Sequence, residues 1–168
     1  MLEFKTPQIE DKAWVDQCFK HLKTMNCDYT FGNMFVWSTE YSTKICRFKD
    51  FFICSWGMGK ETNFGIPVGK GDFKEAVEEV IKYAKANDIM PRFYGVTEAY
   101  VEMLNVNFPD AFQFLYDESY GDYIYEVEKM ASLKGKKYHG KRNHITNFKK
   151  NNPNWSFETI NKDNIDDC

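Results

Sequence analysis

A run of β-rich segments followed directly by one strongly amphipathic helix constrains the fold of this chain most. Residues 43–48 and 51–56 are rich in β-branched and aromatic side chains and are separated by two residues, which predicts a β-hairpin. Residues 63–68 predict a third strand, with Pro67 near its end. A meander that leads into an amphipathic helix predicts a sheet with a helix packed on it.

The helix after the meander has a complete set of boundary signals. Asp72 is expected to cap its first turn, and Glu75 follows three residues later in the pattern of a capping box. Asn87 is expected to end it. Apolar residues recur at helical spacing on one face, namely Phe73, Ala76, Val77, Val80, Ile81 and Ala84.

The remaining segments complete a mixed fold. Further strands are expected at residues 2–5, 91–96, 112–116, 123–127 and 155–160. Helices are expected at residues 6–23 (with Thr6 as N-cap and Pro7 at the first helical position), 98–106 and 138–150, while 30–37 fits a helix or a strand. The order to residue 127 is β-α-α-β-β-β-α-β-α-β-β. It predicts an α/β or α+β fold, with a mixed sheet and helices on both faces.

Composition narrows the class of protein. The chain has 168 residues, of which 43% are hydrophobic and 17% aromatic, so it can form a dense core and is neither disordered, collagen-like nor a coiled coil. Its longest strongly apolar stretch, residues 51–56, is far shorter than the ~20 residues that a membrane span needs. The first residues lack a signal-peptide pattern. A cytoplasmic protein is therefore expected.

The cysteines indicate reduced thiols. There are five, at positions 18, 27, 46, 54 and 168, without a CxxC motif or Cys/His spacing suited to zinc. In the predicted hairpin Cys46 lies opposite Ile53, and Cys54 lies opposite Ile45, so the two sulfurs point to opposite faces. We expect neither a disulfide nor a metal site.

Charge is concentrated in one segment. Residues 129–150 contain eight Lys and Arg and no acidic residue, so this basic segment carries +8 and the rest of the chain −11. This separation predicts a local anion-binding surface. On a helix, Lys137, Lys141 and His144 would share one face. Alternatively, the segment is a solvated connecting helix that packs through Ile145 and Phe148.

A glycine loop offers a second candidate anion site. Gly69, Lys70 and Gly71 connect the expected third strand to the capped helix, and backbone amides at such a junction can hold a phosphate. The alternative is an ordinary strand-to-helix turn. It is favoured because the carboxylate of Asp72 at the cap would repel a phosphate.

Candidate catalytic groups are sparse. His139 and His144 lie among lysines, and His21 lies in the first helix, but spacing identifies no acidic partner for any of them. Tyrosines near residue 121 could include a general acid, and packing is the alternative role for each: Tyr120, Tyr123 and Tyr125. The sequence contains no Ser/His/Asp or Cys/His arrangement. The catalytic residues stay unassigned.

One long motif suggests a family. The matching residues are Tyr123 and Tyr125, followed by Leu133, Gly135, Lys136, Lys137, His139, Lys141, Arg142, Asn143, Ile145 and Phe148. This pattern resembles the C-terminal domain family of phosphatidylglycerol lysyltransferases, whose relatives include the FemABX aminoacyltransferases. The order of elements is similar to that of the GNAT superfamily of acyl-CoA-dependent N-acyltransferases.

The resemblance implies a transferase. Such proteins would transfer an acyl or aminoacyl group from CoA or charged tRNA to an amine or hydroxyl acceptor. The acceptor would attack directly while a base removes its proton, without a covalent enzyme intermediate. CoA or acyl-CoA would be a substrate, with no covalently bound cofactor. The residues implied for anion binding are Lys136, Lys137, His139, Lys141, Arg142 and Asn143, and the weaker loop Gly69, Lys70 and Gly71.

The resemblance also implies a partial unit. Family members continue into a second GNAT-like half, where the donor site would be expected. We therefore expect a GNAT-like domain at residues 1–132, and a basic helix with the start of a second half at 133–168. Self-association or a missing half is a corollary. The alternative function is a non-catalytic GNAT-like module whose basic helix binds a polyanion: CoA, a lipid headgroup or RNA.

Overall fold

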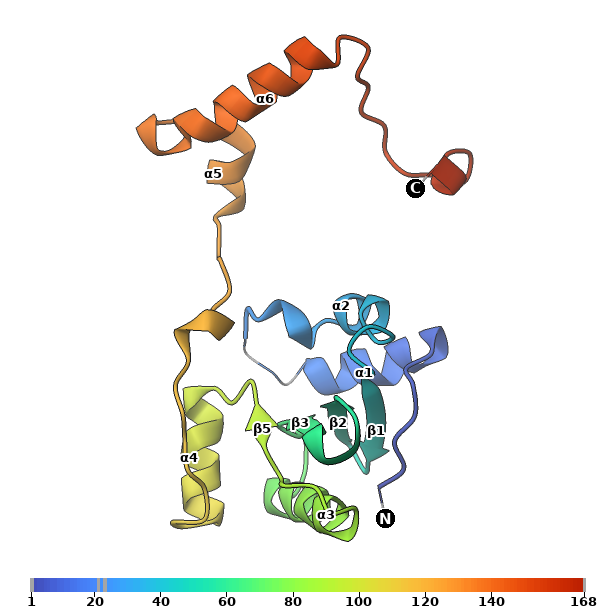
Figure 1. Ribbon diagram of the computed structural model, residues 1–168, viewed down its shortest axis with the longest axis vertical. Helices are drawn as coiled ribbons and strands as arrows, with labels where there is room; N and C mark the ends of the chain where they lie inside the picture. Colours follow the sequence, from blue (N-terminus) through green and yellow to red (C-terminus); the bar gives the residue numbers. More distant parts are fainter. Residues whose placement is uncertain (1, 21, 23, 168) are drawn as a thin grey trace. The chain divides into compact units, whose positions relative to one another are not determined.

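The computed structural model describes residues 2–20, 22 and 24–167. Contacts between residues divide the chain into two compact units, Met1–Asp122 (unit 1) and Tyr123–Cys168 (unit 2), and each is described by itself. The expected boundary between residues 132 and 133 stays a prediction. Figure 1 shows the elements of both units.

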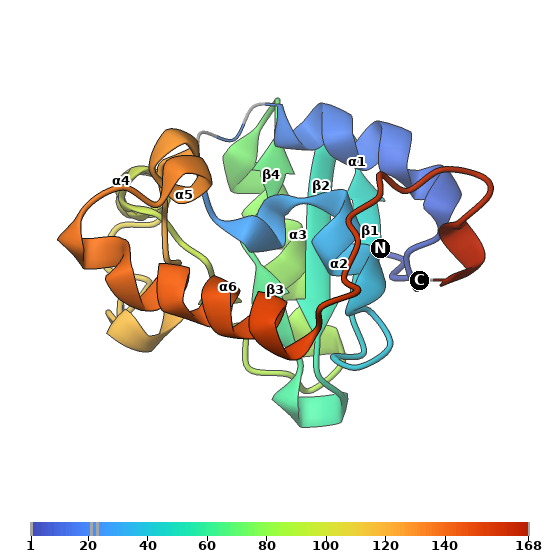
Figure 2. The same cartoon turned by 90° about the horizontal axis from the view of Figure 1, so that it is seen from above.

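Unit 1 contains a five-stranded mixed sheet. Its strands are β1 (Lys44–Phe48), β2 (Phe51–Trp56), β3 (Asn63–Gly65), β4 (Val68–Gly69) and β5 (Phe93–Tyr94). The order is β1-β2-β3-β5, with β4 also paired to β2, so β2 lies between β1 and β4 (Figure 2). All pairs are antiparallel except β3 with β5. The mixed α+β class is confirmed.

The expected third strand is interrupted. β3 pairs Phe64 with Ser55, and β4 pairs Val68 with Phe52. Three residues thus lie between the paired positions Phe64 and Val68, but only two lie between their partners on β2, so one residue is extra, as in a β-bulge. Pro67 lies in the interruption. Because proline has no N–H to give to a ladder, the single strand predicted over residues 63–68 is wrong there.

Helices cover both faces of the sheet, as predicted (Figure 1). The helices of unit 1 are α1 (Lys12–Phe19), α2 (Phe31–Val36), α3 (Phe73–Ala86) and α4 (Glu98–Asn107). On one face the ring of Phe52 contacts Trp14 and Phe19 of α1. On the other, Phe64 contacts Tyr83 of α3. These contacts join the sheet to its helices through aromatic side chains.

The beginning of the chain differs from the prediction. Residues 2–5 form only one isolated bridge, Lys5 with Ile45, in place of a strand. A 3-10 turn, Ile9–Asp11, precedes α1, so the helix does not begin at residues 6 and 7. The carboxylate of Asp11 accepts a hydrogen bond from the backbone N–H of Gln8 at 2.9 Å, which sets the start of the turn at Gln8.

The predicted helix end also shifts. Helix α1 ends at Phe19, and the expected helical residues His21 and Lys23 lie outside the described part of the chain. Segment 30–37 is resolved as a helix, because the Thr30 side chain accepts a hydrogen bond from the backbone N–H of Asn33 and caps α2.

The capped helix α3 matches its prediction. Asp72 Oδ1 accepts a hydrogen bond of 3.0 Å from the Glu75 backbone N–H, and Asn87 is the C-cap. The carboxylate of Glu75 pairs with the ammonium group of Lys49 in the hairpin turn. The side chains on the apolar face are buried, except that Ile81 is half-buried.

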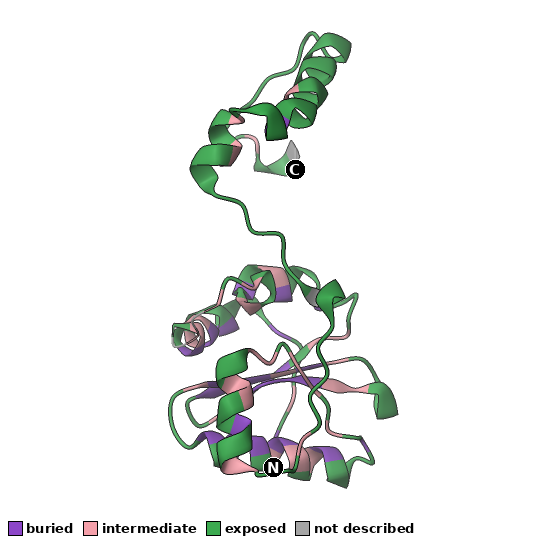
Figure 3. Cartoon of the chain, turned by 90° about the vertical axis from the view of Figure 1, so that its left-hand side faces the viewer, coloured by how far each residue is buried: buried purple, intermediate pink, exposed green. Residues whose placement is uncertain are grey.

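Unit 2 is helical and has little interior. It contains α5 (Val127–Ser132) and α6 (His139–Asn151), and α6 is preceded by a 3-10 turn, Lys136–Tyr138. The predicted basic helix is therefore confirmed. Among its described residues only Tyr138 is buried (Figure 3). Further 3-10 turns of the chain are Cys27–Tyr29, Gly59–Glu61, Glu118–Tyr120 and Ile165–Asp167.

Three predicted strands do not form. Residues 112–116, 123–126 and 155–160 are not strands, and Val127 begins α5. Their side chains are mostly exposed, including Tyr123, Phe157 and Ile160. The aromatic and β-branched composition is suitable for a sheet, but within the described residues no neighbouring strand pairs with these segments.

Candidate functional site

The candidate anion site is the basic segment, residues 129–150, in unit 2. It consists of most of α5, a short connection, the 3-10 turn and most of α6. In the connection Leu133 has φ 47° and Gly135 has φ 94°, and the second value is available chiefly to glycine. This tight connection brings the start of α6 back to the end of α5.

Arg142 holds the connection together. Its guanidinium donates hydrogen bonds to the backbone carbonyl oxygens of Leu133 and Gly135, the second at 2.9 Å. The Leu133 carbonyl lies just past the end of α5, and the Gly135 carbonyl also accepts a hydrogen bond from the backbone N–H of Tyr138 at 3.4 Å. Arg142 is half-buried, and these bonds give it a positioning role in the connection, while its predicted part in anion binding stays a prediction.

Three lysines are free to bind an anion. Lys136, Lys137 and Lys141 are exposed, and in the described part of the chain none of them forms an ion pair. The ammonium nitrogen of Lys141 lies 5.5 Å from the centroid of the Tyr125 ring, and that of Lys137 lies 5.9 Å from the Tyr138 ring. These aromatic contacts orient the side chains and leave their N–H donors available.

The other predicted members of the site form a local pair. Asn143 Nδ2 lies 3.2 Å from His139 Nε2, one helical turn earlier on α6. Both residues are exposed. The pair lies on the same helix as Lys141 and spans one turn of α6.

The glycine loop has a structural explanation. A Cβ at Gly69 would lie 2.8 Å from the Cα of Phe51, so only glycine allows this approach of β4 to β2. The amide of Lys70 donates to the carbonyl oxygen of Asp50 at 3.4 Å. Asp72 already caps α3 with its carboxylate. This loop lies in unit 1, whereas the basic segment lies in unit 2, and these contacts favour the ordinary-turn interpretation.

Comparison with known protein families shows which family the chain belongs to. The model of the family described as phosphatidylglycerol lysyltransferase, C-terminal, matches residues 19–168. The chain belongs to this lysyltransferase C-terminal family. The match includes the whole basic segment and the aromatic motif before it, which confirms the resemblance found in the sequence. The curated proteins contain no significant match.

A solved structure supports the fold of this family member. The chain is similar to a conserved protein of unknown function from Bacteroides thetaiotaomicron VPI-5482, with 31% identity and a TM-score of 0.82. The similarity covers 100% of this chain and 57% of that one, so the chain spans little more than half the length of its solved relative. Of the described helices, none combines the length and apolar character needed to cross a bilayer.

Membership of the lysyltransferase family does not by itself assign a catalytic residue. No carboxylate forms an ion pair with His139 or His144 in the described residues, and both histidines are exposed. Tyr123 is 89% exposed and Tyr125 is 48% exposed. The side chain of Tyr120 and all of His21 lie outside the described part. No catalytic role is therefore assigned to any of these side chains.

The alternative role for α6 is a solvated connecting helix that packs through Ile145 and Phe148. Ile145 is 45% exposed and Phe148 is 53% exposed, so within unit 2 they do not form a buried contact. Only Tyr138, in the turn before α6, has the buried position that this alternative requires.

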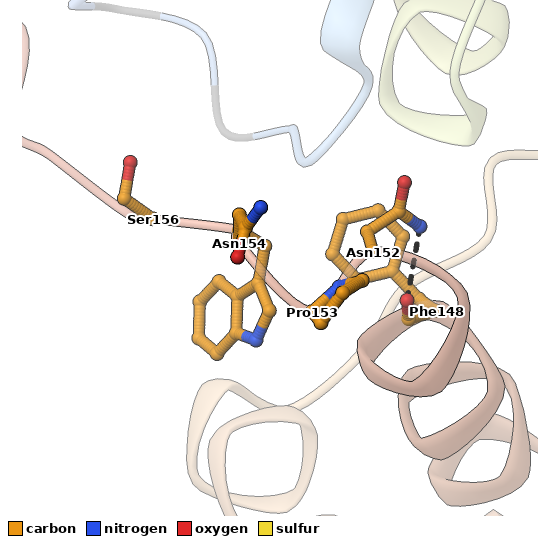
Figure 4. A pocket seen from close by; sticks show the side chains of 6 residues that line it. Phe148, Asn152, Pro153, Asn154 and Ser156 are labelled. Carbon is orange, nitrogen blue, oxygen red and sulfur yellow. Dashed lines mark hydrogen bonds between the residues drawn. The ribbon is translucent and has the colours of Figure 1, made fainter.

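Sequence reasoning missed a shallow pocket at the end of α6 (Figure 4). Its walls are the side chains of Phe148, Asn152, Pro153, Asn154, Trp155 and Ser156. Lys149 Nζ lies 4.7 Å from the centroid of the Trp155 ring, and Asn152 Nδ2 donates to the Phe148 carbonyl oxygen at 2.9 Å. An aromatic residue just past a proline-terminated helix was the available signal. The pocket is open and offers a ring face beside a cation.

The two cysteines of the hairpin are Cys46 and Cys54. Cys46 and Ile53 are paired across the hairpin, as are Cys54 and Ile45, so the predicted register is confirmed. Both thiols are free, and burial raises the pKa of Cys54 to about 12, which keeps it protonated. The described residues contain no group of three His, Cys, Asp or Glu side chains able to hold a metal ion.

Proposed function

We propose that this chain takes part in acyl or aminoacyl transfer from CoA or charged tRNA to an amine or hydroxyl acceptor. The observation that supports it is the family match over residues 19–168, which includes the basic segment. On the fold we propose a GNAT-like relationship, in keeping with the mixed sheet covered by helices on both faces.

The role proposed for the basic segment is to bind phosphate. CoA and tRNA are both donors whose acyl group is attached to a phosphate-bearing carrier. Lys136, Lys137 and Lys141 have exposed ammonium groups without ion-pair partners among the described residues. A lysine binds phosphate as a point charge with three donors, and a charge-assisted hydrogen bond is stronger than a neutral one.

The proposed reaction is direct attack on the activated acyl carbon. The acceptor nitrogen or oxygen forms the new amide or ester bond, while the thioester or ester bond to the carrier breaks. The carrier leaves as a thiol or a ribose hydroxyl after it gains a proton, and a base removes the proton of the acceptor. Arg142 supports phosphate binding indirectly. Its hydrogen bonds fix the connection that leads into the 3-10 turn of Lys136 and Lys137.

A second candidate is a non-catalytic module that binds a polyanion. The exposed positions of His139, Tyr123 and Tyr125 favour it, since none of them lies in a described cleft. In this case affinity would depend on charge and length of the anion and would fall steeply with salt.

Calorimetric titration with CoA, acetyl-CoA and a short RNA tests the proposal at low and moderate salt. The informative variant is Lys137→Ala/Lys141→Ala. The matched control, Lys149→Ala/Lys150→Ala, removes the same charge from the other end of the same helix. Arg142 is left intact because its loss would disturb the connection itself.

Each outcome separates the two functions. Saturable CoA binding that survives moderate salt, and that the informative variant weakens by about tenfold while the control does not, supports a donor site. RNA binding that both variants weaken equally, with no CoA binding, supports the polyanion module. Absence of binding to all three ligands contradicts both.

A further inference from the structure

The pocket at the end of α6 lies entirely within unit 2 and combines an aromatic ring with a cation (Figure 4). Trp155 lines this pocket and is 44% exposed. The ammonium nitrogen of Lys149 lies 4.7 Å from the centroid of the Trp155 ring, and the Phe148 ring meets that ring edge-on, with 6.5 Å between the centroids. These two contacts hold the indole ring at the pocket. A flat ring held beside a positive charge is a surface on which a planar heterocycle can stack.

Polar groups of the pocket are available to bind the edge of such a heterocycle. The side chains of Asn154 and Ser156 line the pocket, and neither forms a hydrogen bond within the described part of the chain. Asn152 donates from its amide nitrogen to the Phe148 carbonyl oxygen, and its side-chain oxygen remains an acceptor. The pocket therefore offers donors and acceptors beside the ring. These groups suit a nucleobase, whose edge carries ring nitrogens, carbonyl oxygens and amino groups.

The pocket is continuous with the basic segment. Residues 129–157 contain no Asp or Glu, so the stretch without acidic residues reaches past Trp155. Lys149 and Lys150 lie in the last turn of α6, where both are exposed and neither forms an ion pair among the described residues. A nucleotide whose base lies on the Trp155 ring would therefore meet positive charge at its phosphates.

The open form of the pocket favours a chain of nucleotides over a single one. Stacking of one base on one aromatic side chain strengthens binding by only about tenfold to a hundredfold. The remaining affinity must come from several phosphates, which a nucleic-acid strand supplies to a basic surface and a free nucleotide does not. The base must also be unpaired, because a base inside a duplex has both of its faces covered by neighbouring bases.

We propose that this pocket binds an unpaired base of a single-stranded nucleic acid. The base stacks on the Trp155 ring, and Asn154 and Ser156 form hydrogen bonds to its edge. The adjoining phosphates contact Lys149 and Lys150. This inference rests on the proposed anion binding only for these phosphate contacts. No part of CoA is assigned to the pocket, so loss of the two lysines is still expected to leave CoA binding unchanged.

Fluorescence anisotropy tests the proposal with a labelled RNA single strand of about eight nucleotides and a blunt RNA duplex of the same length, at about 50 mM and about 200 mM salt. The test variant Trp155→Ala removes the ring without changing the charge, and Trp155→Phe keeps an aromatic face. The matched control is Phe157→Ala, which removes an aromatic side chain that is 85% exposed and does not line the pocket. Circular dichroism checks that each variant keeps its helical content.

Trp155→Ala should weaken binding of the single strand by about tenfold or more, whereas Trp155→Phe and Phe157→Ala should stay within about threefold of wild type. Because Trp155→Ala removes no charge, the dependence of the affinity on salt should not change. The duplex should bind more weakly than the single strand, and Trp155→Ala should not alter its affinity.

A wild-type chain that does not bind the single strand would overturn the proposal. Unchanged affinity in Trp155→Ala would do the same, as would equal losses in Trp155→Ala and Phe157→Ala. If CoA binding depends on Lys137 and Lys141 but the single strand does not bind, this inference fails and the proposed donor site stands. If the single strand binds through Trp155 and CoA does not bind at all, this inference stands and the CoA site fails.

Discussion

Unit 1 and unit 2 differ in how many of their side chains are buried. In unit 1 a mixed sheet is covered on both faces, and side chains such as Phe52 and Phe64 are almost completely buried. In unit 2 two helices are joined by a tight connection, and Tyr138 is the buried residue among those described. The difference teaches that unit 1 can be stable by its own contacts, whereas unit 2 depends on local hydrogen bonds and on whatever binds its exposed surface.

The largest expected effect compares two phenylalanines, one in each unit. Phe52→Ala should lower the free energy of unfolding by about 3–5 kcal/mol, because its ring is 1% exposed and contacts Trp14 and Phe19. Phe157→Ala should change it by less than about 0.5 kcal/mol, because Phe157 is 85% exposed. Urea unfolding followed by circular dichroism measures both. Equal losses would contradict the division into a packed and an unpacked unit.

A pair of glycines sharpens the comparison. Gly69→Ala should cost about 1–3 kcal/mol, because the new methyl group would meet the backbone of Asp50 and Phe51. Gly140→Ala should instead stabilise α6 by about 0.5–1 kcal/mol, because nothing lies within 4 Å of the added Cβ and alanine favours helix. Thermal unfolding measures the first change and helical content the second. A destabilising Gly140→Ala would show that unit 2 is packed at this helix.

A pH-dependent contribution is expected in unit 1. Burial alone would raise the pKa of the Asp11 carboxyl, but hydrogen bonds from Lys5, Trp14 and a backbone amide outweigh it and lower that pKa. Because the folded pKa lies below the unfolded one, the stabilisation is present above the ordinary carboxyl pKa and is lost as pH falls through the lowered value. Asp11→Ala should therefore cost about 1–3 kcal/mol near neutral pH.

Urea unfolding of wild type and variant at neutral and strongly acidic pH checks this expectation. The stability difference between them should shrink as the medium is acidified. Asp11→Asn is the control, since it keeps the shape of the side chain without its charge. A difference that is the same at both pH values would mean that the Asp11 side chain acts through packing.

The smallest expected effect is confined to unit 2. Arg142→Ala should remove two hydrogen bonds to backbone carbonyls and cost about 1 kcal/mol locally, because the site is only half-buried. Hydrogen exchange should become faster at residues 133–138 and stay unchanged in α3. Faster exchange in both regions would show that the units are coupled in stability.

Structural features that depend on residues close together in the sequence were predicted correctly. The Asp72 cap, the register that places Cys46 opposite Ile53, and the basic helix all follow from local geometry and were confirmed. Each depends on neighbours in the chain, so one sequence contains the needed information.

Strands that need a pairing strand from elsewhere in the chain were predicted poorly. The strands expected at residues 112–116, 123–127 and 155–160 have suitable side chains, but a strand forms only where another strand accepts its hydrogen bonds. The helix start expected at Thr6 was wrong for a local reason, since the Asp11 carboxylate accepts a hydrogen bond from the Gln8 backbone N–H and moves the start of the turn to Gln8. In the candidate site the free lysines were anticipated from charge alone. The positioning role of Arg142 was not, because it follows from the left-handed backbone at Leu133.

The bonds that Arg142 makes have a consequence for experiments on the charges around it. Its partners are two backbone carbonyls, which do not titrate, and a guanidinium keeps its proton at any ordinary pH. Added salt weakens attraction between exposed charges but has little effect on short hydrogen bonds to neutral oxygens. The connection between α5 and α6 therefore acts as a fixed frame, because the bonds that hold it do not change with pH or salt. A change of pH or ionic strength can alter what the surrounding lysines attract while the frame that carries them keeps its shape.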